Sequence, residues 1–132
     1  MNIPFSPGMH LLIDLWGASH LDEIDHVERA LKQAAIACGA TILSVHLHSF
    51  GKNSGVTGVA ILAESHISIH TWPEIDYVAL DVFLCGNSDP HRAVPVLHEF
   101  FKPKKMKVTE AARGNKYRLF NFKISGDGVA LC

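Results

Sequence analysis

Residues 64–74, ESHISIHTWPE, combine groups that can do chemistry with the alternation of a β-strand. The stretch holds two carboxylates, two serines, two histidines and a tryptophan around two isoleucines. Successive side chains of a strand point to opposite faces, so Ile67 and Ile69 should face a core. The polar and aromatic residues at the alternate positions should then share the other face: His66, Ser68, His70 and Trp72.

Three further predicted strands bring similar groups to that face. Segments 9–17, 41–50 and 77–85 alternate between apolar and polar residues in the same way. The apolar residues of the second segment are expected on the core side: Leu43, Val45 and Leu47. The side away from the core would carry a set of ionisable and aromatic groups: His10, Asp14, His46, His48, Phe50, Asp81 and Cys85. Such a face is too polar for a second core and too rich in reactive groups for an ordinary surface.

The composition indicates an ordinary globular domain. The chain has 132 residues, of which 48% are hydrophobic and 19% are charged, and its net charge is -1. A domain of this length buries about two thirds of its unfolded surface, so a single domain over residues 1–132 is expected. The low net charge argues against a disordered chain and against nucleic acid as a partner.

The sequence also disfavours a membrane protein and a secreted one. Its apolar runs fall short of the roughly 20 residues that span a bilayer, and MNIPFSPGMH lacks the regions of a signal peptide. We therefore expect a cytoplasmic protein. Cys38, Cys85 and Cys132 are widely spaced without a CxxC motif, which disfavours a disulfide framework or a thiolate zinc site. A functional cysteine would act as a thiol.

Two helices are predicted between the strands. Ser19 and Asp22 form a capping-box-like start for the first, whose apolar residues keep helical spacing until Gly39 ends it. The second helix, residues 89–102, has an aspartate as N-cap and a proline at its first position. Pro95 within this helix should remove one hydrogen bond and bend it.

The order of the elements predicts an α+β fold. Strands are expected at seven segments: 9–17, 41–50, 56–63, 66–72, 77–85, 105–114 and 116–122. Residues 123–132 are expected to form a loosely held tail. This order suits a two-layer sandwich, in which both helices pack on one face of a mainly antiparallel sheet. The other face then needs a cover or a function.

Residue chemistry alone leaves several functions open. Any single histidine is most often a solvated or structural residue. His46 and His48 project from one strand face like a ligand pair, but no carboxylate or cysteine accompanies them at a recognised metal spacing, so we expect no metal site. Ser65 lies in AESHI and not in a glycine-flanked nucleophile elbow, which disfavours serine-hydrolase chemistry.

A longer stretch resembles a known family. GVTGVAILAESHISIHTWPE, residues 55–74, closely resembles the signature of the prokaryotic S-adenosylmethionine decarboxylases, which are pyruvoyl-dependent enzymes made as self-cleaving proenzymes. The similarity extends through YVALDVFLCG to Arg113 and Gly114, and so covers roughly residues 9–114. It implies autocatalytic cleavage of the Glu64–Ser65 bond into a β chain, residues 1–64, and an α chain, residues 65–132.

The resemblance also implies how that cleavage proceeds. The Ser65 hydroxyl would attack the carbonyl of Glu64 and turn the amide into an ester, a step that a strained turn would help. Removal of the Ser65 α-proton would eliminate the Glu64 carboxylate and leave a dehydroalanine. Its imine tautomer would react with water and release ammonia, which leaves Ser65 as a pyruvoyl group. By resemblance, His70 is the processing base, since an imidazole can take a proton near neutral pH. Thr57 lies where the family commonly has a serine and would supply the processing hydroxyl.

The mature site implied by the resemblance decarboxylates S-adenosylmethionine for polyamine biosynthesis. The pyruvoyl group forms a Schiff base with the substrate amine and replaces a bound coenzyme such as PLP, without a metal. Cys85 matches the family's proton donor, and Glu74 matches its ribose-binding glutamate. Phe50 and Trp72 are candidates for stacking on adenine and facing the sulfonium. The family assembles as homodimers whose sites draw on both protomers.

Three alternatives remain open at the level of sequence. Relatives of this family decarboxylate arginine or ornithine with the same serine, histidine and cysteine, although Glu74 and the aromatic residues favour a nucleoside substrate. A non-catalytic histidine-rich module could bind metal or a partner and never cleave itself. A processing-defective relative could serve as a partner subunit, but the presence of Glu64, Ser65, His70 and Cys85 speaks against that.

Overall fold

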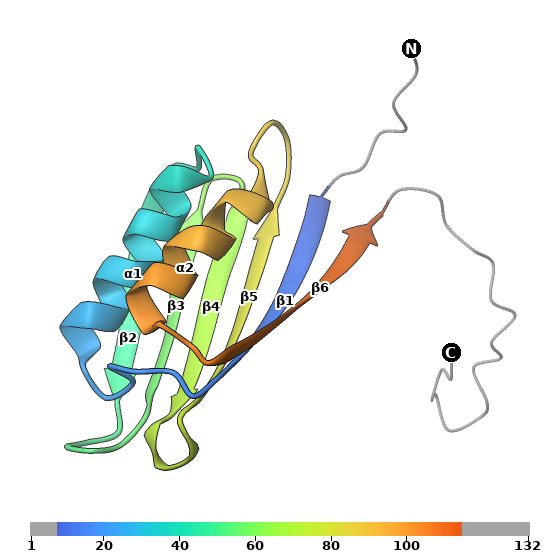
Figure 1. Ribbon diagram of the computed structural model, residues 1–132. Coiled ribbons are helices and arrows are strands. Elements are labelled where there is room, and N and C mark those ends of the chain that lie inside the picture. The colour runs from blue at the N-terminus through green and yellow to red at the C-terminus, as the bar shows by residue number, and fades with distance from the viewer. Residues whose placement is uncertain (1–7, 115–132) are drawn as a thin grey trace, which may run out of the picture.

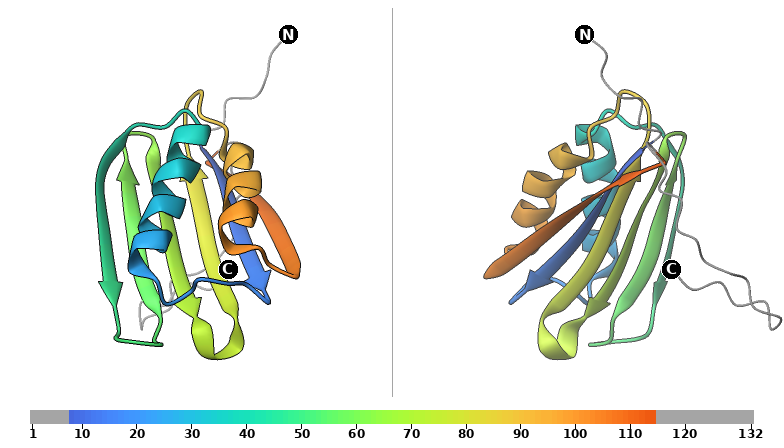
Figure 2. Two further views of the ribbon diagram at one scale, coloured as in Figure 1. Left: turned by 60° about the vertical axis from the view of Figure 1, so that its left-hand side comes forward. Right: turned by 90° about the vertical axis from the view of Figure 1, so that its right-hand side faces the viewer.

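One antiparallel sheet covered by two helices on one face makes up the fold of this chain (Figures 1 and 2). The computed structural model describes residues 8–114. The sheet order is β2-β3-β4-β5-β1-β6, with strands β1 (Gly8–Trp16), β2 (Ile42–Ser49), β3 (Val56–Leu62), β4 (Ser65–Trp72), β5 (Tyr77–Leu84) and β6 (Lys105–Arg113). The helices are α1 (Ile24–Ala37) and α2 (Ala93–Phe101). This two-layer α+β sandwich confirms the predicted fold class.

The core lies between the helices and one face of the sheet, as the alternation predicts. Leu11, Ile67 and Val82 from three neighbouring strands are all fully buried, and so is Phe101 of α2. Each such side chain contributes about 1.5–3 kcal/mol when it leaves water. The opposite, open face carries no helix within residues 8–114 (Figure 2). His66 and Ser68 are both hydrogen-bonded to Asp81 on that face, since the residues that alternate with them are buried in the core.

Helix α1 begins later than the sequence predicts. Ser19 and Asp22 do not cap it, because the helix starts at Ile24 with Glu23 as N-cap. Tertiary hydrogen bonds hold the preceding segment out of the helix: the Ser19 amide donates to a carbonyl of α2, and the Thr71 hydroxyl donates to the Leu21 carbonyl at 2.6 Å. The predicted end is correct, since α1 ends at Ala37 and Gly39 follows with a left-handed φ of 74°.

Helix α2 is preceded by one turn of 3-10 helix, Pro90–Arg92, so the predicted helix divides into two pieces. Asp89 caps that turn as expected and accepts from the His91 amide at 3.0 Å. Pro95 is the third residue of α2. It lies in the first turn, where the amide groups have no acceptor within the helix, so the predicted loss of a helical hydrogen bond is wrong.

The expected position of Leu43 is also wrong. The register between β2 and β3 shifts between Ile42 and Ser44, which inserts one extra residue into β2. Leu43 is therefore 63% exposed, while Val45 and Leu47 pack against the core as predicted. The predicted strand 116–122 and tail 123–132 lie outside the described residues. Within residues 8–114, neither helix is long and apolar enough to cross a membrane.

Candidate active site

The Glu64–Ser65 bond lies in the tight turn that joins β3 to β4. Three hydrogen bonds hold this turn: the Ala63 amide donates to the Thr41 carbonyl at 2.9 Å, and the Thr41 amide donates to Oε1 of Glu64 at 2.8 Å. The third runs from the Cys85 amide to the carbonyl oxygen of Glu64 at 3.0 Å. That oxygen gains negative charge if the carbonyl is attacked, so the Cys85 amide is placed to stabilise it.

Ser65 has a strained backbone. Its φ is 142°, a value that residues with a side chain rarely adopt and that costs about 1–3 kcal/mol. The residue is nevertheless paired in the sheet, opposite Leu84 of β5. Strain at the residue after the bond is the feature that the family resemblance led us to expect.

Two cysteines of the described chain differ sharply in their surroundings. Cys38 follows α1, is buried, and has a pKa raised to about 11, chiefly by burial. Cys85 follows β5 directly and is only half-buried. The hydrogen bond from the Cys85 backbone amide to the Glu64 carbonyl continues the ladder of hydrogen bonds between β4 and β5. Of these two cysteines, Cys85 is therefore the one that lies next to the turn between β3 and β4.

A cavity of about 360 Å³ gathers most of the other predicted site residues at the opposite end of the sheet. Five of its lining residues were predicted from the sequence: Phe50, Thr57, His70, Trp72 and Glu74. Thr57 and His70 face each other across β3 and β4, with Oγ1 of the threonine 3.2 Å from Nδ1 of the histidine. The structure thus brings together the two residues to which the resemblance gives processing roles.

Aromatic side chains continue from this cavity over the open face. The ring of Trp72 lies 5.4 Å from that of Tyr77, which in turn lies 6.0 Å from that of Trp16. The Tyr77 hydroxyl donates to Asp14, and this hydrogen bond is the main cause that raises the pKa of Tyr77 to about 12. Trp72 is 40% exposed, so its ring is available to stack on a flat ligand.

The predicted residues therefore form two groups and not one. The loops β3–β4 and β5–α2, with Ser65 and Cys85, lie at one end of the sheet, and loops β2–β3 and β4–β5 lie at the other (Figure 1). Ser65 and Trp72 are the first and last residues of β4, about 23 Å apart at about 3.3 Å per residue. His70 lies about 16 Å from Ser65 by the same measure. Within one chain, the two groups therefore lie at opposite ends of the sheet.

A polar network occupies the open face beside the turn. Nε2 of His10 and Nε2 of His66 both donate to Oδ2 of Asp81, at 2.6 and 2.8 Å, and the Ser68 hydroxyl donates to Oδ1. Burial alone would raise the pKa of Asp81, but these hydrogen bonds hold it below its usual value, so the carboxylate stays charged. Arg113 of β6 donates to Nδ1 of His10 at 3.0 Å.

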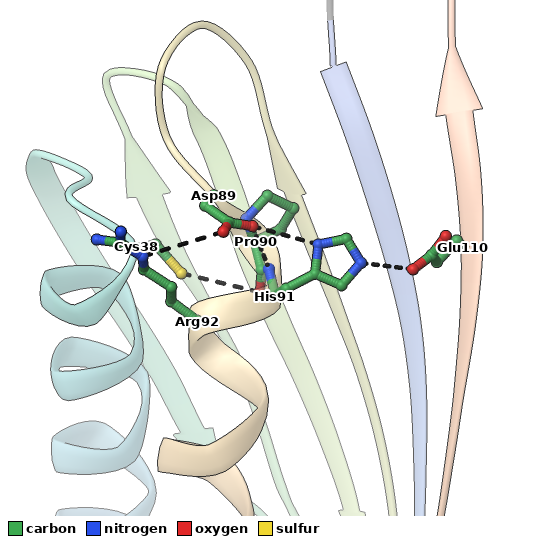
Figure 3. A network of polar contacts seen from close by, with 6 residues as sticks. All are labelled: Cys38, Asp89, Pro90, His91, Arg92 and Glu110. Carbon is green, nitrogen blue, oxygen red and sulfur yellow. Dashed lines mark hydrogen bonds and ion pairs between the residues drawn. The ribbon is translucent and has the colours of Figure 1, made fainter.

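A second network anchors the loop that follows Cys85 (Figure 3). Nε2 of His91 lies 2.5 Å from Oε1 of Glu110 on β6, and its Nδ1 lies 3.2 Å from Oδ1 of Asp89. The Asp89 amide donates to the Cys38 carbonyl at 3.3 Å. The pKa of His91 is raised, first by the hydrogen bond to Glu110. Carboxylates accept and do not donate when charged, so this arrangement favours a protonated His91 that ties the loop to β6.

Sequence reasoning missed three parts of this arrangement. It assigned no role to Thr41, whose amide holds Glu64, and none to the backbone amide of Cys85, because a main-chain donor leaves no trace in the residue types. It placed His10, His66 and Asp81 on one face from their alternation. It had no means to predict that Arg113 would join them, because the pairing of β6 with β1 is not evident from the chain order.

The turn has the features of a self-cleaving pyruvoyl proenzyme. A serine follows a carbonyl that is held by an amide donor, and the serine itself carries backbone strain. A pyruvoyl group is made from such a serine in place, so it needs no separate binding cavity for a coenzyme. The residues of the turn therefore fit the class of pyruvoyl-dependent enzymes.

Comparisons with known proteins agree with this class. The S-adenosylmethionine decarboxylase family profile matches residues 9–114. The chain is 44% identical over 110 residues to the S-adenosylmethionine decarboxylase proenzyme of Thermomicrobium roseum, a match that covers 83% of this chain and 95% of the relative. It is 48% identical over 110 residues to the proenzyme of that name from Methanococcus maripaludis strain C5, covering 81% and 89%.

A solved structure is similar as well. The crystal structure of the adenosylmethionine decarboxylase from Aquifex aeolicus VF5 matches with a TM-score of 0.76 and 34% identity, and the match covers 89% of this chain and 98% of that one. The chain therefore belongs to the S-adenosylmethionine decarboxylase family. Its members are pyruvoyl-dependent carboxy-lyases of polyamine biosynthesis that are made as proenzymes and cleave themselves.

Proposed function

We propose that this chain decarboxylates S-adenosylmethionine after cleaving itself at Glu64–Ser65, in active sites that two protomers share. The observation that carries the shared site is the distance along β4. Ser65 and Cys85 lie at one end of the sheet, whereas His70, Trp72 and Glu74 lie at the other. A homodimer related by a two-fold axis, with its open faces in contact and its strands antiparallel, would bring unlike ends together.

The open face supports such a dimer. It carries exposed apolar side chains beside half-buried polar ones, including Leu12 at 44%, Trp16 at 37% and Trp72 at 40% exposure. Packing two such faces about 10 Å apart removes these side chains from water and encloses the polar residues as well. Two equivalent sites would then form, each with the turn of one protomer and the cavity of its partner.

In the uncleaved chain, residues of both protomers would act on the Glu64–Ser65 bond. The Cys85 amide stabilises the charge that develops on the Glu64 carbonyl oxygen as the Ser65 hydroxyl attacks it. Thr57 and His70 would come from the other protomer, with the imidazole accepting the proton that leaves Ser65. Thr57 keeps the hydroxyl that the family usually takes from a serine, and its extra methyl group adds little bulk. The products would be residues 1–64 and 65–132.

In the mature site, the chain's own residues would bind the substrate and move one proton. The pyruvoyl group supplies a carbonyl that accepts electrons as carbon dioxide leaves, without PLP. Glu74 has two carboxylate oxygens for the two ribose hydroxyls, while Trp72 and Phe50 offer rings to the adenine and the sulfonium. The thiol of Cys85 would give its proton to the substrate α-carbon. A cytoplasmic location remains a prediction of the sequence.

Complementation between two inactive variants tests the shared site. A tagged Ser65→Ala chain keeps His70, and an untagged His70→Ala chain keeps Ser65. We expect both to remain uncleaved when produced alone. When they are produced together, the mixed dimer should cleave only its His70→Ala chain, at Glu64–Ser65 by intact mass, and release labelled carbon dioxide from S-adenosylmethionine.

The control pairs the His70→Ala chain with a Ser65→Ala, His70→Ala double variant, which should leave both chains intact. Capture through the tag establishes that mixed dimers form. Cleavage of the His70→Ala chain on its own would contradict the role of His70. An intact His70→Ala chain inside captured mixed dimers with Ser65→Ala would contradict the shared site.

A further inference from the structure

The network around Asp81 carries an inference that extends the proposed function. The cluster of His10, His66 and Asp81 places three ligand atoms within 4.8 Å of one another, as a metal site would. The hydrogen bonds around it indicate another use. A guanidinium group can only donate, so the bond from Arg113 requires an unprotonated Nδ1 on His10. His10 then carries its proton on Nε2, where it donates to Asp81 and has no lone pair for a metal.

His66 is held differently from His10. Its Nε2 must carry a proton, because the charged Asp81 carboxylate can only accept. Its Nδ1 is left to exchange protons, as in other imidazoles oriented by a carboxylate. The charged and titratable groups that face this ring are Asp81 of β5 and His10 of β1, with Arg113 behind His10. The apolar Phe83 ring packs edge-on at 6.0 Å.

The sheet register makes Cys85 a diagonal neighbour of this oriented histidine. His66 pairs directly with Phe83 of β5, and Asp81 and Cys85 lie two residues before and after Phe83. Diagonal neighbours of this kind lie about 7–8 Å apart at Cα, within reach of an imidazole. One diagonal neighbour of His66 is therefore the carboxylate that orients it. The other is the thiol that the proposed function uses as proton donor.

We propose that His66, oriented by Asp81, is the proton-exchange partner of Cys85 and reloads its thiol between turnovers. When Cys85 gives its proton to the substrate carbon, the S–H bond breaks and a thiolate remains. The cationic form of His66 then transfers its Nδ1 proton to that sulfur and becomes neutral. Water returns a proton to Nδ1, which restores the starting state. Asp81 acts here as a positioning residue, because it holds Nε2 protonated and leaves Nδ1 to exchange.

This inference rests on the proposed function, but it can be tested first in chains that make no pyruvoyl group. In Ser65→Ala protein, a basic nitrogen beside Cys85 should increase the fraction of reactive thiolate. We expect His66→Gln to slow the alkylation of Cys85 by iodoacetamide about tenfold at neutral pH, and Asp81→Asn to slow it less. Peptide mass spectrometry follows Cys85 alone, and the buried Cys38 serves as an unreactive internal reference.

His98→Gln is the matched control, because His98 is an exposed histidine on α2, away from the open face. In the cleaved enzyme, His66→Ala should lose decarboxylation per pyruvoyl group by about 10²-fold, and added imidazole should restore part of it. A residue that only supports the fold would not be rescued in this way. Thermal unfolding and intact mass establish that each variant is folded and cleaved.

The outcomes separate the two proposals. Suppose that wild-type protein is cleaved and active, while His66→Gln matches His98→Gln in Cys85 alkylation and in turnover. Proton exchange between His66 and Cys85 is then wrong, and the proposed function stands. If wild-type protein neither cleaves nor decarboxylates S-adenosylmethionine, the proposed function fails whatever the alkylation result. If added zinc slows Cys85 alkylation in wild-type protein but not in His66→Gln, His66 belongs to a metal site and the proposed proton exchange is wrong.

Discussion

The two ends of the sheet differ in how they are built. The end with Ser65 is held by main-chain hydrogen bonds from Thr41 and Cys85, and it stores strain in the backbone. The end with Trp72 and Glu74 is a cavity lined by side chains, several of them exposed. The comparison shows that the turn around the Glu64–Ser65 bond is held by backbone donors, whereas the cavity offers side chains that could contact a ligand. Changes to Trp72 and Glu74 should therefore have effects that can be separated from those of a change to Ser65.

The largest expected effect is at the turn. Ser65→Ala removes the attacking hydroxyl, so the chain should remain at full length and show no decarboxylation. Intact mass under denaturing conditions measures this directly. Ser19→Ala, which changes an exposed serine far from the turn, should be cleaved like wild type. Activity in the uncleaved Ser65→Ala protein would refute the pyruvoyl mechanism as a whole.

Cys85→Ala should separate the two functions of the same residue. Alanine keeps the backbone amide that holds the Glu64 carbonyl, so cleavage should continue. It removes the thiol, so decarboxylation per cleaved chain should fall by about 10²-fold or more. Intact mass gives the cleaved fraction, and release of carbon dioxide gives the rate. Cys38→Ala is the matched cysteine control, and equal losses in both variants would contradict the assignment.

At the cavity end, Trp72→Ala should leave cleavage intact and weaken substrate binding. Loss of one aromatic face that stacks on a base costs about 1–3 kcal/mol, which raises KM about fivefold or more. Glu74→Gln should have a smaller effect in the same direction, because the amide still offers one acceptor oxygen. Glu99→Gln, on the exposed side of α2, should leave KM unchanged. A lower kcat with unchanged KM would argue against a binding role at this end.

The smallest expected effect is on stability, through the hydrogen bonds that His91, in the loop after Cys85, makes to Glu110 and Asp89. The raised pKa of His91 means that the folded state binds the proton more tightly than the unfolded state. The stabilisation is then fully present below the ordinary histidine pKa of about 6.5 and is lost as pH rises through the raised value. Since these side chains are about half exposed, we expect less than about 1 kcal/mol.

Thermal unfolding of wild type and Glu110→Gln as a function of pH measures how much the bond between His91 and Glu110 stabilises the fold. The difference in Tm should be largest at acidic pH and should shrink toward alkaline pH. Glu28→Gln, which removes the half-exposed partner of Lys32, should show no such trend. A difference that grows as pH rises would contradict the assigned proton on His91.

Much of the site could be predicted because strand alternation is a local property. The order of polar and apolar residues was enough to place His66, His70 and Asp81 on one face and Ile67 on the other. The motif around Ser65 identified the family before any coordinate was known. The roles that the family gives to Ser65, His70 and Cys85 stay predictions until the variants are measured.

Two of the wrong predictions concern places where distant segments decide the local structure. The Thr71 hydroxyl donates a hydrogen bond to the Leu21 carbonyl and holds the segment before α1 out of the helix. The capping pattern at Ser19 therefore does not start a helix. An extra residue in β2 turned Leu43 outward, because register depends on the partner strand as well as on the sequence. Neither effect can be seen in a window of neighbouring residues.

By itself, the sequence determined the elements, their apolar faces and the family, because these follow from spacing along one chain. Only the tertiary structure decided that β1 lies between β5 and β6, which brings Arg113 to His10 and Glu110 to His91. Strand order and the directions of side chains are set by contacts between distant segments, and such contacts exist only once the chain has folded.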